Sequence, residues 1–177
     1  MNLLPSQIYR QQADAGLIQD DPAQRAVVAL LDAMATALRL GPGSGLFGIR
    51  FGKPKAVKGL YLWGSVGRGK TLMTELLIAG LSGVAFQRWH FHRFMNDVHR
   101  QLAAMPDTAD TLAVLAKRIA AECRLLVLDE FFVSDIGDAM ILHRLLDQLV
   151  AHGVSFVSTS NVAPDELYPN GLQRASF

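Results

Sequence analysis

The sequence has little cysteine, and this limits its chemistry. Cys123 is the single cysteine among 177 residues, so no internal disulfide can form. This cysteine content suits a reducing compartment. Because Cys123 directly precedes an apolar segment, we expect a buried and unreactive thiol.

Net charge and long hydrophobic runs are also lacking. The formal net charge is +1, so no strong overall field favours nucleic acid or anionic lipid as a partner. No apolar run is long enough to span a membrane. The N-terminus lacks the features of a secretory signal, and Asp14, Asp20 and Asp21 argue against a mitochondrial transit peptide. These absences predict a soluble cytoplasmic protein.

The most informative segment that is present matches the P-loop pattern G-x-x-x-x-G-K-[ST]. It consists of Gly64, Ser65, Val66, Gly67, Arg68, Gly69, Lys70 and Thr71. An apolar run over 58–63, a predicted buried strand, precedes it, and leucines at helical spacing follow it as far as Gly80. This strand–helix frame disfavours an accidental glycine-rich turn.

Each part of this loop has a predicted task. The glycines let backbone N–H groups point at the phosphates of a nucleotide, and the helix N-terminus adds partial positive charge. Lys70 is expected to reach the β- and γ-phosphates, and the Thr71 hydroxyl to ligate Mg²⁺. Arg68 is expected to face outward.

The remaining chain alternates between predicted helices and strands. Helices are predicted at 6–15, 22–40, 93–105, 108–122, 135–151 and 164–168, and strands at 84–91, 124–129 and 154–159. Half of the residues are hydrophobic, enough for one domain with a core. The alternation predicts an α/β three-layer sandwich with a mostly parallel sheet. We divide it into an N-terminal helical segment with a basic loop, 1–57, and a nucleotide-binding domain, 58–177.

Two carboxylates follow the most apolar predicted strand. The segment Leu125–Asp129 leads directly into Glu130, which is the Walker B pattern. Open parallel sheets bind ligands at the carboxyl ends of their strands, so Asp129 is predicted to hold Mg²⁺ through water. Glu130 is predicted to orient a water molecule for attack on the γ-phosphate, which favours hydrolysis over transfer. The alternative is that the two residues merely end a strand.

Polar residues also end the next predicted strand. Asn161 is the best candidate for the sensor-1 position of AAA+ ATPases, where a polar side chain contacts the γ-phosphate or the attacking water. Thr159 and Ser160 are its neighbours. An ordinary serine-rich turn is the alternative.

Four further blocks resemble one family. In chain order they are Gly59–Gly64, Phe91–Met95 with Val98 and His99, Asp129–Ile136, and Gly171–Arg174. Together they closely resemble the ZapE-type AAA+ ATPases of bacterial cell division and their mitochondrial relatives. The resemblance implies Mg²⁺-dependent ATP hydrolysis, a homo-oligomer and association with the division apparatus built on FtsZ. It also implies a cytoplasmic location, peripheral at the division site or inner membrane.

The same resemblance implies parts beyond this sequence. AAA+ sheets have the strand order 5-1-4-3-2, of which this chain supplies the first four strands. The fifth strand and the helical lid are expected to be absent, as in a C-terminally truncated chain. Such a chain is expected to hydrolyse ATP poorly and to aggregate.

Several residues keep two interpretations each. Arg174 is either an arginine finger or a solvated side chain. Phe91–Phe94 either face a ring pore or, as we prefer, pack in the core. Gln24 either reads adenine or, as we prefer, is solvated.

His90 and His92 would share a strand face, but with His99 they lack partners for a zinc site, so polar packing is favoured.

Two rival functions remain open. A helicase-loader-like module would bind DNA through an ATP switch, and the basic loop with Arg50, Lys53 and Lys55 gives it slight support. The low net charge does not support nucleic acid binding. A scaffold that binds ATP without hydrolysing it would follow from the truncation.

Overall fold

The computed structural model describes residues 3–40, 55–105 and 110–167. They fall into two compact units, which are described separately: one takes its residues from 1–52 and 66–84, the other from 53–65 and 85–177. Most of the basic loop predicted at 41–57, including Arg50 and Lys53, lies outside the described residues, as does Arg174. The domain boundary after residue 57 stays a prediction.

The first unit is helical. It contains α1 (Pro5–Asp14), α2 (Pro22–Leu40) and α3 (Lys70–Ala79), which contact one another. Asp21 precedes α2 and caps it: its carboxylate accepts a hydrogen bond from the N–H of Ala23 at 2.8 Å, and Pro22 takes the first turn. The Arg39 guanidinium donates to the carbonyls of Gly80 at 2.7 Å and Leu3 at 2.6 Å, which ties the ends of the helices together.

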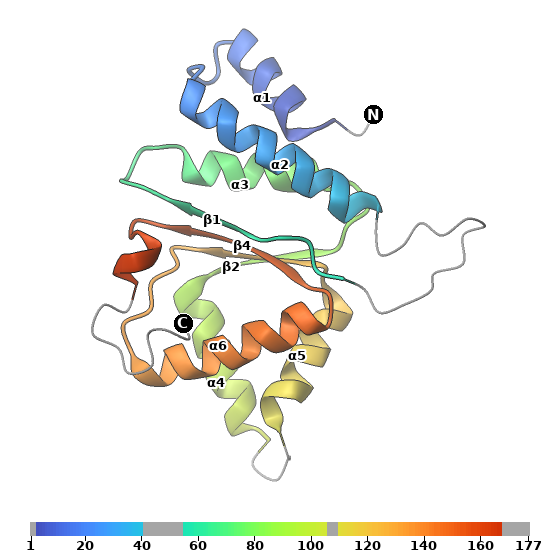
Figure 1. Cartoon of the computed structure of the whole chain (residues 1–177), viewed down its shortest axis with the longest axis vertical. Helices are drawn as coiled ribbons and strands as arrows, with labels where there is room; N and C mark the ends of the chain where they lie inside the picture. The colour runs from blue at the N-terminus through green and yellow to red at the C-terminus, as the bar shows by residue number, and fades with distance from the viewer. Residues whose placement is uncertain (1–2, 41–54, 106–109, 168–177) are drawn as a thin grey trace, which may run out of the picture. The chain divides into compact units, whose positions relative to one another are not determined.

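The second unit is built on a parallel sheet. Its strands are β1 (Leu60–Trp63), β2 (Phe86–His90), β3 (Leu125–Asp129) and β4 (Ser155–Ser160), in the order β1-β4-β3-β2. Helices α4 (Phe91–Ala103), α5 (Thr111–Glu122) and α6 (Ile136–Ala151) cover one face of it (Figure 1). A short 3₁₀ helix, η1 (Pro164–Glu166), follows β4. The predicted parallel sheet and its strand order are confirmed.

The core of this unit lies between the sheet and its three helices. β3 is buried along its whole length, and Leu126 and Leu128 point into the core. Phe91 and Phe94 of α4 are 5% and 3% exposed, so the preferred interpretation of the phenylalanine pair as core residues is confirmed. The burial of β3 explains why its sequence is continuously apolar up to Asp129.

Three predicted boundaries or environments were wrong. The second strand ends at His90 and α4 begins at Phe91, so His90 and His92 do not share a strand face. Asp135 precedes α6 and caps it, accepting the N–H of Gly137 at 2.7 Å. β1 is not buried: it lies at one end of the strand order, and Trp63 is 57% exposed.

Cys123 gives a first testable prediction. The thiol is 2% exposed, and burial, with a smaller effect of the Glu122 charge, raises its pKa from 9.0 to about 11. Between these two pH values the unfolded chain releases the proton and the folded chain keeps it. The free energy of unfolding should therefore fall by up to about 2 kcal/mol as pH rises from 9 to 11.

Urea unfolding at several pH values measures this effect, and Cys123→Ala is its control. The difference in free energy of unfolding between the natural chain and the variant should shrink over that pH range. A difference that does not change with pH would contradict the prediction.

Candidate nucleotide-binding site

The predicted P-loop has two glycines in a backbone conformation that other residues rarely adopt. β1 ends at Trp63 and α3 begins at Lys70, so the loop joins a strand to a helix N-terminus. Gly67 and Gly69 both have φ of 82°, in the left-handed region that favours glycine. A Cβ added at Gly67 would meet no atom within 4 Å, so the space directly beside this residue is open. The backbone therefore suits a phosphate group.

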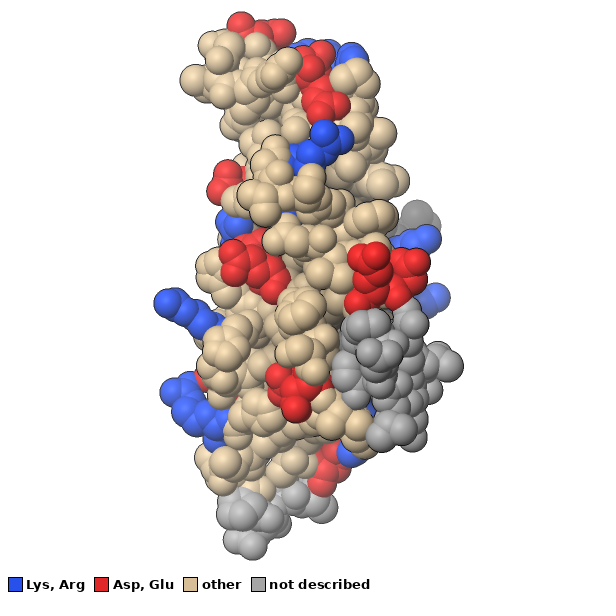
Figure 2. Space-filling view, turned by 90° about the vertical axis from the view of Figure 1, so that its left-hand side faces the viewer, with Lys and Arg blue, Asp and Glu red and all other residues tan. Residues whose placement is uncertain are grey.

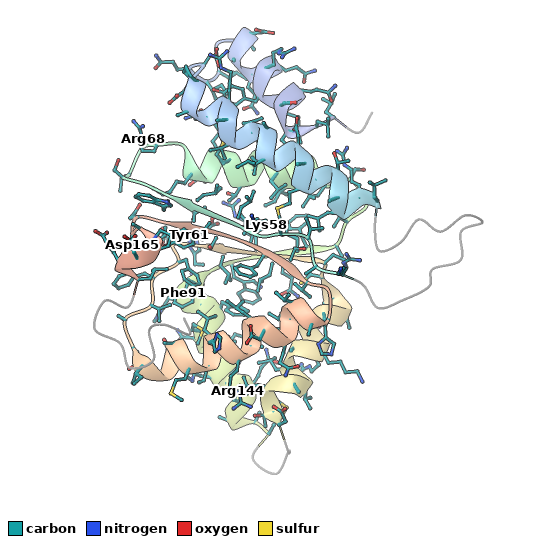
Figure 3. All side chains as sticks on the ribbon, viewed as in Figure 1. Lys58, Tyr61, Arg68, Phe91, Arg144 and Asp165 are labelled. Atoms are coloured by element: carbon teal, nitrogen blue, oxygen red, sulfur yellow. The ribbon has the colours of Figure 1, made fainter. Side chains whose placement is uncertain are left out.

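Gln24 of α2 supports this loop from one side. Its Nε2 donates to the Arg68 carbonyl at 3.4 Å, and its Oε1 accepts from the Tyr9 hydroxyl at 3.3 Å. A Cβ on Gly69 would lie 2.6 Å from the same Nε2, so a larger residue there would displace the Gln24 side chain, and the φ of 82° itself favours glycine. The preferred interpretation of Gln24 as a solvated residue was therefore wrong. The Arg68 side chain is exposed and points away from the ribbon, as expected (Figure 3).

Asp129 ends β3 with both carboxylate oxygens engaged. Oδ2 accepts from Nε of Arg88 at 2.6 Å, and Oδ1 accepts from the Thr159 hydroxyl at 3.2 Å. The Asp129 side chain is only 11% exposed. These two contacts fix the direction of the carboxylate that is predicted to serve Mg²⁺.

Glu130 follows in a strained conformation that leaves its carboxylate accessible. Its φ of 57° lies in the left-handed region, unusual for a residue other than glycine. Its N–H donates to the Thr159 hydroxyl at 3.2 Å, which holds the turn. The side chain is 78% exposed and lies 3.6 Å from Nδ1 of His90. Since it borders a cavity of about 260 Å³, the carboxylate has room to bind and orient water.

The beginning of the P-loop lies at this same edge of the sheet. The Gly64 N–H donates to the Ser160 carbonyl at 3.2 Å, so the loop starts beside the end of β4. Tyr61 of β1 donates its hydroxyl to the Val162 carbonyl at 2.8 Å, and burial raises the pKa of this phenol. The carboxyl ends of β1, β3 and β4 thus carry Gly64, Asp129 and Thr159.

The three polar residues at the end of β4 differ in their environments. Thr159 contacts Asp129 as described above. Ser160 is 2% exposed, and its hydroxyl donates to the Phe131 carbonyl at 2.7 Å. Ser160 therefore has a structural role. Asn161 follows the strand and is exposed, so it remains available for the sensor role, which stays a prediction.

The contacts of Arg88 and Thr159 with Asp129 were not predicted from the sequence. The sequence places Arg88 in the predicted strand at 84–91 without a specific contact. It marks Thr159 only as a neighbour of Asn161. Parallel pairing puts His90 opposite Asp129 and Arg88 opposite Val127, so Arg88 and Asp129 share a sheet face. Alternation along a strand puts Arg88 and Trp89 on opposite faces of the sheet. It does not identify the partner of Arg88, which depends on the register between β2 and β3.

The histidines make separate local contacts. His99 is 2.6 Å from an Asp138 oxygen, and His92 is 3.1 Å from the Asn96 amide nitrogen. Within residues 3–40, 55–105 and 110–167, no group of three or more His, Cys, Asp or Glu side chains could hold a metal ion. The carboxylate oxygens of Asp129 suit Mg²⁺ in chemistry, because Mg²⁺ is bound by few protein oxygens together with phosphates and waters.

Comparison with known proteins supports a nucleotide-binding fold. The family model described as AFG1-like ATPase matches residues 3–177. The chain belongs to this family. It is 42% identical to the cell division protein ZapE of Escherichia coli K12 over 99% of this chain and 50% of that protein. Lactation elevated protein 1 homolog B of Danio rerio is 41% identical over 71% of this chain and 27% of that protein. The chain thus spans half, or less, of these relatives.

Solved structures show the same fold at low sequence identity. AMPPCP-bound DnaA from Aquifex aeolicus has a TM-score of 0.61 at 13% identity, over 90% of this chain and 44% of that chain. DnaI has a TM-score of 0.58 at 17% identity, over 86% and 76%. The predicted α/β P-loop NTPase fold is confirmed for this AFG1-like chain. No helix in the described part of the chain is long and apolar enough to cross a membrane.

Proposed function

We propose that this AFG1-like chain binds ATP with Mg²⁺ and hydrolyses it. The observation that carries the proposal is the arrangement after β3, where Thr159 accepts the Glu130 N–H and donates to the Asp129 carboxylate. One hydroxyl thereby orients the Asp129 carboxylate and holds the backbone at Glu130. The Asp129 side chain is mostly buried and its carboxylate accepts two hydrogen bonds, which suits a metal ligand. The Glu130 side chain is exposed, which suits a group that orients water.

The proposed roles of the P-loop follow from its chemistry. Backbone N–H groups of 64–71 bind the phosphates, and Lys70 neutralises the charge of the β- and γ-phosphates. The Thr71 hydroxyl and the Asp129 carboxylate hold Mg²⁺, which neutralises charge on the phosphate oxygens. Glu130 orients water and accepts its proton. Asn161 contacts the γ-phosphate, and Arg174, outside the described residues, serves as the arginine finger.

A phosphate-release assay tests the proposal. The purified chain should release phosphate from ATP, and EDTA should reduce this to the rate without protein. Release at an equal rate in EDTA, or no binding of ATP at all, would contradict the proposed function.

We further propose a cytoplasmic homo-oligomer that acts on the FtsZ-based division apparatus. The link to cell division rests on the name of the E. coli relative, and FtsZ on the resemblance to ZapE-type ATPases. Exposed apolar side chains support a protein partner. Phe132, Ile136 and Met140 are 54%, 40% and 57% exposed, and the last two share a face of α6. On the face in Figure 2, Lys and Arg are interspersed with Asp and Glu, which suits a protein partner better than nucleic acid.

Co-sedimentation with FtsZ polymers tests this partner. The chain should sediment with the polymers when an ATP analogue is present and remain in solution without them. Binding to DNA that weakens with salt, without any binding to FtsZ polymers, would instead favour the helicase-loader alternative.

A further inference from the structure

The contact between Arg88 and Asp129 is unexpected for a metal ligand. Arg88 Nε lies 2.6 Å from Asp129 Oδ2, and the two side chains are 30% and 11% exposed. A guanidinium group is charged at every accessible pH, so Asp129 already has a permanent cationic partner. The partial burial of both groups limits screening by water and salt.

This contact places a cation beside the carboxylate that is proposed to hold Mg²⁺. Two positive groups that share one carboxylate repel each other, and the repulsion is stronger for a divalent ion. The second oxygen of Asp129 already accepts the Thr159 hydroxyl, so the carboxylate cannot turn away from Arg88 without losing that bond. A metal ion alone would therefore bind poorly at Asp129.

The phosphates of ATP change this balance. A triphosphate brings several negative charges, enough to compensate both the metal ion and a guanidinium group nearby. We propose that Arg88 is a counter-ion of Asp129 that makes metal binding at this carboxylate depend on bound nucleotide. The inference rests on the proposed function, because it requires Asp129 to be a metal ligand.

The test uses the whole chain with Mn²⁺ as the probe, detected by electron paramagnetic resonance of the free ion. Without nucleotide, Arg88→Gln should bind Mn²⁺ at least about tenfold more tightly than the natural chain, because the repulsion is removed. Arg88→Lys retains the charge and should stay within about threefold of the natural chain. With a non-hydrolysable ATP analogue, the advantage of Arg88→Gln should shrink to less than about threefold.

Other outcomes would overturn the inference. Unchanged Mn²⁺ affinity of Arg88→Gln without nucleotide would show that the charge of Arg88 does not matter. Weaker binding both with and without nucleotide would show that Arg88 only positions the carboxylate. If circular dichroism shows that Arg88→Gln does not fold, Arg88→Met, with an unbranched neutral side chain, replaces it with the same expectations.

Asp129→Asn separates this inference from the proposed function. It should abolish nucleotide-dependent Mn²⁺ binding in an otherwise natural chain. If binding persists, Asp129 is not the metal ligand, and the metal assignment in the proposed function fails. If binding is lost but Arg88→Gln behaves as the natural chain does, only the role of Arg88 is rejected.

Discussion

Replacing Glu130 with glutamine should lower kcat for ATP hydrolysis by about 10²- to 10⁴-fold, the range that general base catalysis contributes. Glutamine keeps the size of the side chain but cannot accept the proton of the attacking water. The Glu130 side chain is 78% exposed and only its backbone N–H contacts Thr159, so the substitution should not disturb the fold. The affinity for ATP should therefore stay within about threefold of the natural value.

Phosphate release and binding of a fluorescent ATP analogue measure the two quantities separately. Glu166→Gln, at an exposed position on η1, is the matched control and should leave both unchanged. Equal loss of ATP binding and of hydrolysis in Glu130→Gln would point to a structural effect. An unchanged rate of phosphate release would remove Glu130 from the mechanism and favour the non-hydrolysing scaffold.

Replacing Lys70 with alanine should weaken ATP binding by about 10- to 100-fold, since a charge-assisted hydrogen bond to phosphate contributes about 1.5–3 kcal/mol. The effect should be specific for the outer phosphates. Affinity for AMP, which lacks the β- and γ-phosphates, should change by less than about threefold. This difference between ATP and AMP distinguishes a lost phosphate contact from a damaged loop.

Tryptophan fluorescence offers a direct readout of this binding. Trp63 is 57% exposed and directly precedes Gly64, so nucleotide binding at the loop should change its emission. Lys117→Ala, on the exposed side of α5, is the control and should bind ATP as the natural chain does. If Lys70→Ala loses AMP and ATP affinity equally, the proposed contact of Lys70 with the outer phosphates is wrong.

Local patterns in the sequence were sufficient for most of the second unit. The strand β3 was predictable because a strand buried on both faces must be apolar throughout, and its end was marked by two carboxylates. The strand order followed from the AAA+ resemblance and was confirmed. The boundary between β2 and α4 was not predicted correctly. The strand ends at His90 and the helix begins at Phe91, with no turn residue between them to mark the change.

The environments of individual side chains were harder to predict than the elements. Gln24 has no local partner, and its contact with the Arg68 carbonyl joins residues 44 positions apart. A glutamine on a helix is usually solvated, so only tertiary packing reveals that this one supports the P-loop. β1 was predicted to be buried from its apolar composition, which does not record its position at the end of the strand order.

The P-loop, the two carboxylates after β3 and the parallel α/β fold were all determined by residue types and short-range spacing. Phosphate binding and strand burial each impose such local requirements. The partners of Asp129 were decided by the tertiary structure, because parallel pairing brings Arg88 of β2 and Thr159 of β4 to the same carboxylate from 41 and 30 residues away. The charge beside the proposed metal ligand depends on strand register, a property of the assembled sheet that no single segment specifies.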